Sequence, residues 1–82
     1  MAVYKILVDV MLKPEILDPQ GQAVANALPN LGFASPQSLR IGRHVELALD
    51  AADGTAALEQ ATKIADTLLA NPVIEDYTVR LA

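Results

Sequence analysis

The chain has no cysteine, no tryptophan, a single histidine, and aromatic residues at only 4% of its 82 positions. Without cysteine there are no disulfides, no thiolate nucleophile and no zinc site built on sulfur. The lone His44 does not make a metal site, and we interpret it as an exposed strand residue beside a turn. By strand alternation, Glu46 is the only acidic residue expected near it.

Long apolar runs and an excess of positive charge are also absent. No run approaches the ~20 apolar residues of a membrane helix. The apolar start is broken by Lys5, Asp9 and Lys13, so it does not resemble a secretory signal. The net charge is -4, which opposes binding to a phosphate backbone. We therefore predict a soluble cytoplasmic protein that binds neither membranes nor nucleic acid.

What remains is a short chain rich in aliphatic residues. Apolar residues make up 52% of it and charged residues 20%, a balance typical of a globular domain. The length predicts one domain, residues 1–82. A chain of this size buries only roughly 60% of its unfolded surface. Small folds often gain the missing burial by forming oligomers.

The spacing of apolar residues predicts an α+β fold. Strand, helix, strand, strand, helix and strand are expected in that order, at residues 3–12, 18–31, 39–41, 44–50, 53–70 and 73–81. We interpret Gly42-Arg43 as the tight turn between the two middle strands. This β-α-β-β-α-β order is ferredoxin-like: an antiparallel sheet with both helices on one face.

Local signals mark the helices. In the first, Asp18 suits the N-cap, Pro19 the first helical position and Gly32 the stop, while Pro29 should kink the last turn. The second helix should begin at Asp53, end at Asn71-Pro72, and present one apolar stripe. That stripe comprises Leu58, Ala61, Ile64, Ala65 and Leu68.

One face of the predicted sheet has no helix to cover it. Leu7 and Met11 are expected there, on the second apolar face of the first strand. We predict that these two residues form an oligomer interface, in which another sheet or subunit covers this face. The oligomer forms either through this face or by exchange of segments between chains.

The inventory for catalysis is thin. Ser35 and Ser38 lack the Gly-x-Ser-x-Gly setting of a nucleophile. Glu75 and Asp76 are strand neighbours that point to opposite faces, so they do not share a proton. The glycines are isolated and do not build a phosphate loop. The sequence predicts no catalytic site.

Two short clusters have both a structural and a functional interpretation. Residues 17–21 read as a helix start, but Gly21 costs ~1 kcal/mol relative to alanine in a first turn. Such a cost is offset where another backbone approaches closely. Residues 40–43 read either as a hairpin with solubilising arginines or as a pair of cations, Arg40 and Arg43, for a carboxylate or phosphate on a partner.

At these clusters the sequence resembles the PurS family, the small subunits of bacterial and archaeal phosphoribosylformylglycinamidine synthase. The resemblance covers Leu12-Lys13-Pro14-Glu15-Ile16-Leu17-Asp18-Pro19-Gln20-Gly21, Arg40-Ile41-Gly42-Arg43 and Leu69-Ala70-Asn71-Pro72-Val73-Ile74-Glu75-Asp76-Tyr77. These stretches occur in the family's order and span nearly the whole chain. Arg43 stands where the family commonly has lysine, His44 where an aromatic is frequent, and Pro29 departs from the pattern.

The resemblance implies a non-catalytic subunit in purine biosynthesis. It would bridge an ATP-dependent PurL-type synthetase and a PurQ-type glutaminase and assist ammonia transfer. It would also associate with itself, as a homodimer or a dimer of dimers. The complex is implied to use ATP, magnesium and glutamine, with no cofactor on this chain.

We expect Asp18, Gln20, Gly21, Arg40 and Arg43 to contact the partner subunits. The alternative function is a ferredoxin-like sensor domain that binds a small molecule such as an amino acid. A stand-alone enzyme conflicts with the thin catalytic inventory, and an RNA-binding module with the few dispersed aromatics.

Overall fold

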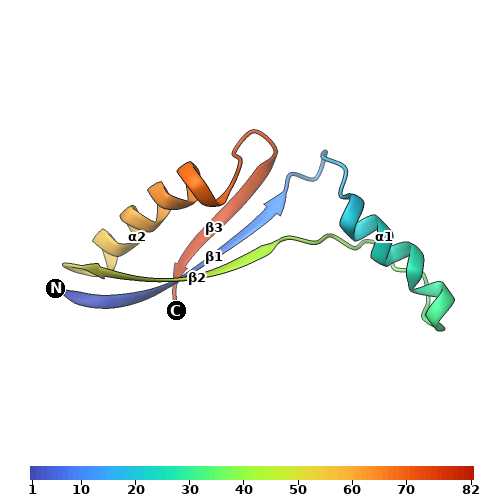
Figure 1. The fold of residues 1–82 in the computed structure, drawn as a ribbon, viewed down its shortest axis with the longest axis horizontal. Helices are drawn as coiled ribbons and strands as arrows, with labels where there is room; N and C mark the ends of the chain where they lie inside the picture. Colours follow the sequence, from blue (N-terminus) through green and yellow to red (C-terminus); the bar gives the residue numbers. More distant parts are fainter.

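The computed structural model describes residues 1–82 and contains one antiparallel sheet of three strands. The strands are β1 (Ala2–Leu12), β2 (Arg43–Ala51) and β3 (Glu75–Leu81), in the spatial order β2-β1-β3 (Figure 1). Val8 of β1 lies opposite Val45 on one side and Val79 on the other. The strand that is apolar on both faces is therefore the central one.

The core lies between this sheet and α2 (Gly54–Ile64), which covers one face (Figure 1). Ile6, Val8 and Val10 are fully buried on that face, as the alternation of β1 predicts. The side chains that α2 buries against them are small: Ala57 and Ala61 have no exposed surface. Alanines let the helix backbone approach the strands closely, so a thin core is still well packed.

Both helix starts were predicted at the right residues. Asp18 caps α1 (Pro19–Ala27), and Asp53 caps α2 by accepting from the backbone N–H of Ala56 at 2.8 Å. Pro29 ends the α-helical bonding of α1 and opens a short 3₁₀ turn, Pro29–Leu31. Gly32 then stops the helix with a left-handed φ of 91°, which glycine adopts without steric cost.

The predicted stripe of α2 is wrong at its last residue. Leu68 is 81% exposed, whereas Leu69 packs against the core. The helix widens into a π turn at Ala65–Leu69, and the N–H of Ala70 donates to the carbonyl of Ala65 at 2.9 Å. A π turn inserts one residue per turn, which moves the next buried position one residue along the chain.

The strand expected at residues 39–41 is not paired within the chain, and the tight turn at Gly42-Arg43 is absent. The chain instead runs without a turn from residue 39 into β2 (Figure 1). Gly42 is needed for another reason. A Cβ there would overlap the Val10 carbonyl oxygen and the Met11 sulfur, because the chain passes directly over the end of β1.

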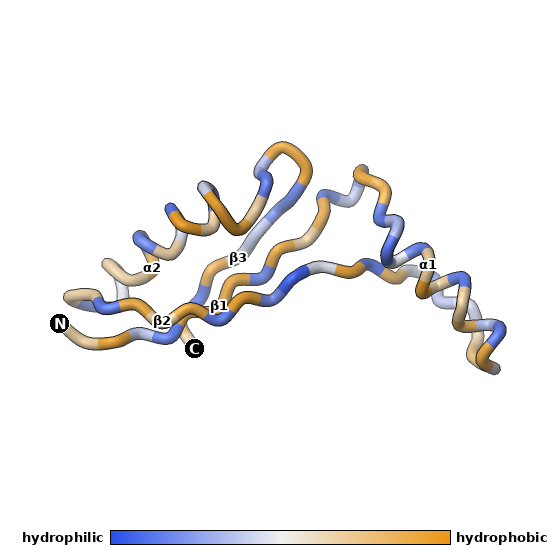
Figure 2. The backbone as a smooth tube through the Cα atoms, in the orientation of Figure 1, coloured by the Kyte–Doolittle hydropathy of each residue, from blue (hydrophilic) through white to orange (hydrophobic).

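The first helix does not lie on the sheet of its own chain. Figure 1 shows α1 beyond the end of the strands, on the side away from α2. We call residues 13–42 the arm; they make the molecule elongated, with extents of 52 × 26 × 16 Å. Apolar residues occur along the arm as well as along β1 (Figure 2). None of the helices is long and apolar enough to cross a membrane.

Candidate docking site

Asp18 ties the start of α1 to the segment that leads into β2. Its Oδ1 accepts from the N–H of Gly21 at 2.9 Å, and its Oδ2 accepts from the N–H of Ile41 at 2.8 Å. These two hydrogen bonds stabilise the carboxylate and hold the pKa of Asp18 below its usual value. We call the place where the start of α1, at residues 18–21, meets the returning residues 39–43 the arm base. Asp18 is only 5% exposed, so it holds the arm base together and offers little surface to a partner.

Gly21 is a position of close backbone approach, as the sequence suggested. A Cβ there would lie 2.9 Å from the carbonyl oxygen of Leu39 and would also collide with the Asp18 carboxylate. The helix start and the returning segment therefore touch backbone to backbone. Only glycine permits this spacing, which explains the cost of placing it in a first turn.

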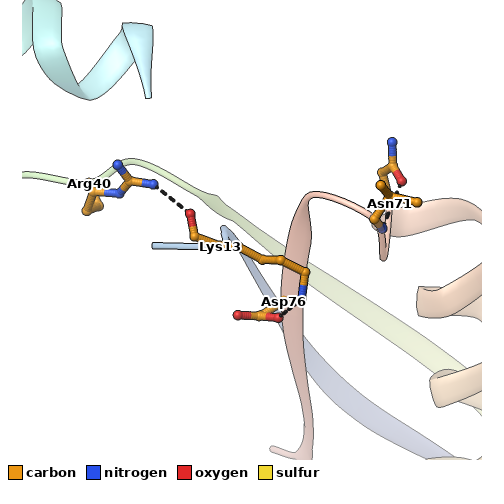
Figure 3. Close-up of polar contacts among 5 residues, drawn as sticks. Lys13, Arg40, Asn71 and Asp76 are labelled. Carbon is orange, nitrogen blue, oxygen red and sulfur yellow. Dashed lines mark hydrogen bonds and ion pairs between the residues drawn. The ribbon is translucent and has the colours of Figure 1, made fainter. Parts of the chain in front are cut away.

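Arg40 holds the loop that follows β1. Its Nη2 donates to the carbonyl of Ile16 at 2.7 Å and to that of Lys13 at 3.1 Å. Lys13 in turn donates from Nζ to Asp76 at 2.6 Å, so it lies between Arg40 and β3 (Figure 3). Arg40 is exposed and uses only Nη2 in these bonds, which leaves its other donors free for an acceptor on another chain.

Arg43 is engaged within the chain. Its guanidinium pairs with Glu75 at 3.0 Å and donates to the carbonyl of Leu69 at 2.8 Å. Glu75 is only 9% exposed and also accepts from the N–H of Asn71 at 2.8 Å. The Arg43 hydrogen bond, followed by that of Asn71, lowers the pKa of Glu75. Through these contacts Arg43 fastens the start of β2 both to the start of β3, at Glu75, and to the end of the π turn that follows α2, at Leu69.

Two hollows flank the arm base, one on each side of the sheet. The first, of about 220 Å³, lies on the side of α2 and includes Gln20, Ile41, Arg43 and Glu75 in its lining. The second, of about 520 Å³, lies on the open side, with Arg40 and Asp76 among its lining residues. The five residues predicted to contact partners are thus brought together at one place. Gln20 and Arg40 have exposed side chains with free donors, and Arg43 is half-exposed beside Glu75.

The open face of the sheet carries an ionic cluster that sequence reasoning missed. Asp9 accepts from His44 at 2.6 Å and from Arg80, and these two bonds, His44 first, lower its pKa. His44 is an exposed strand residue as expected, but its acidic neighbour is Asp9. Glu46 pairs with Lys5 instead, at 3.4 Å. The cluster depends on strand register, which a single sequence does not reveal.

Leu7 and Met11 lie on this open face, as the alternation of β1 predicts. Leu7 is half-buried between Glu46 and Arg80, its partners in register, and Met11 is 39% exposed. The face is therefore more polar than expected. That these two residues form an oligomer interface stays a prediction.

No three His, Asp or Glu side chains gather closely enough to hold a metal ion. The charged groups at the arm base are paired or hydrogen-bonded, with carboxylate pKa values shifted downward. Such groups stay ionised near neutral pH and do not exchange protons there. The arrangement is suited to recognition between chains.

Comparisons with known proteins agree along the whole chain. The family profile described as "PurS: Phosphoribosylformylglycinamidine (FGAM) synthase" matches residues 5–82. The PurS subunit of Mycobacterium leprae is 47% identical over 75 residues, which is 92% of this chain and 91% of that protein. The PurS subunit of Bacillus subtilis is 42% identical over 74 residues, covering 90% of this chain and 87% of that protein.

Solved structures give the same answer and confirm the ferredoxin-like fold class. The PurS chain in the structure of PurLQS from Thermotoga maritima superposes with a TM-score of 0.91 at 30% identity, covering 100% of both chains. A crystal form of Bacillus subtilis PurS gives a TM-score of 0.84 at 39% identity, covering 96% of this chain and 98% of the other. The chain therefore belongs to the PurS family, the small subunits of phosphoribosylformylglycinamidine synthase.

Proposed function

We propose that this chain is the bridging subunit of a phosphoribosylformylglycinamidine synthase and carries no catalytic group itself. The observation that carries the proposal is the full-length likeness, arm included, to the PurS chain of the Thermotoga maritima PurLQS structure. The Methanocaldococcus jannaschii relative is described as one of the subunits of formylglycinamide ribonucleotide amidotransferase in purine biosynthesis.

The partners of this chain are a PurL-type synthetase and a PurQ-type glutaminase, in the cytoplasm. ATP, magnesium and glutamine are used by those subunits, and this chain binds no cofactor. Ammonia released into bulk water is diluted and protonated. A bridging subunit that excludes water between the two sites limits both losses.

The arm base is the docking surface. Gln20 and Arg40 present free polar groups beside the two hollows, on a base held rigid by the Asp18 hydrogen bonds. A rigid base lowers the entropy lost when a partner binds. Asp18 and Gly21 contribute by holding this geometry, and Arg43 contributes its half-exposed edge in the first hollow.

Reconstitution tests the role. The matching synthetase and glutaminase are assayed with and without this chain, with ATP, magnesium and formylglycinamide ribonucleotide present. Either glutamine or an ammonium salt supplies the nitrogen. We expect glutamine-dependent turnover to require this chain and ammonia-dependent turnover not to. If neither assay responds to the chain, the bridging role is wrong.

A pair of matched variants tests the surface. Gln20→Ala removes an exposed amide in the first hollow, and Gln60→Ala removes the same amide from the exposed part of α2. We expect Gln20→Ala to raise the concentration of this chain needed for half-maximal glutamine-dependent turnover, and Gln60→Ala to leave it unchanged. Equal behaviour of the two variants would remove the arm base from the docking surface.

A further inference from the structure

The last turn of α2 departs from the register that the rest of the helix sets. Ala57, Ala61 and Ala65 are fully buried, and they mark the face that the helix turns to the sheet. Measured around the axis from Ala61, an α-helix would place Leu68 only about 20° away and Leu69 about 80° away. The structure has the opposite arrangement, because Leu68 is 81% exposed and Leu69 packs against the core. The π turn at the end of the helix produces this exchange.

Both arrangements bury nearly the same amount of apolar side chain, because the two residues that exchange places are identical. In either one, a single leucine lies against the core and the other is exposed. The hydrophobic effect, which usually fixes a helix on a sheet, therefore does not choose between them. Turns of the π type are rare and frequently lie at functional sites. The choice between the two arrangements depends on polar contacts at the end of the helix.

These polar contacts favour the π turn. The N–H of Ala70 donates to the carbonyl of Ala65 at 2.9 Å, which closes the turn. The Arg43 Nη2 donates to the carbonyl of Leu69 at 2.8 Å. The two terminal nitrogens of Arg43 also contact both carboxylate oxygens of Glu75, at 3.0 and 3.1 Å, so the guanidinium is fixed in one orientation. An α turn would rotate the Leu69 carbonyl about the helix axis, away from Arg43.

The loop between α2 and β3 has room to absorb the difference between the two turns (Figure 1). Asn71, Pro72 and Val73 are all exposed. The start of β3 is held without them, because the N–H of Lys13 donates to the carbonyl of Ile74 at 2.8 Å. The residue that the π turn inserts can therefore pass into this loop while the sheet stays in place.

We propose that residues 65–70 form a two-state element, which Arg43 holds in its π form. In the other form the turn is α-helical, Leu68 lies against the core and Leu69 is exposed. Both forms are packed, so the element has two discrete arrangements and is not continuously deformable. The proposal concerns this chain by itself and does not depend on the proposed function.

Arg43 connects this element to the first hollow. The half-exposed edge of its guanidinium lies there, beside Gln20 and Glu75. An acceptor that enters the hollow competes for the group that holds the Leu69 carbonyl. A carboxylate competes best, because it forms charge-assisted hydrogen bonds with a guanidinium. A contact in the hollow therefore acts on the residue that decides which leucine α2 exposes.

A double-mutant cycle on the two leucines tests the two-state element, with urea unfolding of the full chain at one protein concentration as the measurement. Leu68→Ala should leave the urea midpoint unchanged, because Leu68 is exposed. Leu69→Ala should cost little, since Leu68 then takes its place against the core. The double variant has no leucine to bury. Its unfolding equilibrium constant should exceed that of Leu69→Ala by about five- to 30-fold, as expected for strongly coupled neighbours.

A π turn that does not convert gives a different pattern. Leu69→Ala and the double variant would then be equally destabilised, because Leu68 would be exposed in both. That result overturns the two-state element. A double variant that is as stable as the parent protein overturns it as well, because neither leucine would then contribute to the core.

The same substitutions in a second background test the control by Arg43. Arg43→Met removes the contact to Leu69 and should populate the α form, so that Leu68→Ala now lowers the urea midpoint. Lys13→Met is the matched control, because it removes the cation paired with Asp76, the second residue of β3, and does not touch the π turn. In that background Leu68→Ala should still leave the midpoint unchanged. Equal effects of Leu68→Ala in the two backgrounds would show that Arg43 does not hold the turn.

Discussion

Gly21→Ala tests the close contact at the arm base. Inside a helix this substitution normally stabilises by about 1 kcal/mol, because alanine has the higher helix propensity. Here the added Cβ would lie 2.9 Å from the backbone oxygen of Leu39 and would collide with the Asp18 carboxylate. Overpacking of this kind costs about 1–3 kcal/mol, towards the upper end where the obstacle is backbone. We expect a net loss of about 1–2 kcal/mol.

The loss should appear locally, because α1 lies apart from the core. Amide hydrogen exchange reports local opening, and the N–H of Ile41, bound to Asp18, is the direct probe. A loss of about 1–2 kcal/mol corresponds to roughly 5- to 30-fold faster exchange of this amide. The N–H groups of β1 should keep their exchange rates.

Gly54→Ala is the matched control, at the first residue of α2. Its Cβ would lie 3.1 Å from the end of the Leu81 side chain, which can rotate away, and in ordinary contact with the Tyr4 ring at 4.0 Å. We expect this variant to be as stable as the parent or slightly more stable. If Gly21→Ala leaves the hydrogen-exchange rate of the Ile41 amide unchanged, α1 and the segment at Leu39 do not approach each other as closely as described.

Three further outcomes follow from the structure. Arg43→Met should lower the free energy of unfolding by about 1 kcal/mol, because it removes the half-exposed cation that pairs with the buried Glu75. Urea titration measures this, and an unchanged urea midpoint would contradict it. Ile6→Ala should cost about 2–5 kcal/mol, since Ile6 is fully buried, and equal thermal midpoints for variant and parent would place it outside the core. The pKa values of Glu75 and Asp18 are lowered, so their stabilising contribution is complete above the ordinary values of 4.5 and 3.8. It should be lost as the pH falls below those values, and unfolding free energies that stay constant from pH 6 to pH 3 would contradict this.

The elements that could be read from the sequence are those whose signals are local. The alternation of β1 predicted that Ile6, Val8 and Val10 share a buried face. Asp18 and Asp53 predicted the two helix starts, because a capping carboxylate acts on amides two or three residues away. These patterns are complete within a single turn or a few strand residues, so one sequence is enough to recognise them.

The candidate site was predicted only in part. Its five residues were named from two separate clusters that carry the family resemblance, and the fold brings the two clusters together; that they contact partner subunits stays a prediction. Their roles differ from one another in ways that spacing does not reveal. Asp18 and Gly21 are buried and join the start of α1 to the segment before β2. Arg43 forms an ion pair with Glu75, which lies 32 positions away in the chain. Whether Arg43 and Glu75 pair depends on where the chain lies in the folded structure after it leaves α2. No local sequence pattern encodes that position.

The sequence alone determined the class of fold, the face of β1 that is buried, and the residues at which both helices begin, since periodicity and capping are properties of neighbouring residues. The tertiary structure alone decided that Gly42 passes over the end of β1 without turning, and that α1 therefore leaves the sheet as part of an arm. Glycine permits both a tight turn and a close crossing. Only the position of Val10 and Met11 beneath it selects the crossing, because that contact joins residues about thirty positions apart.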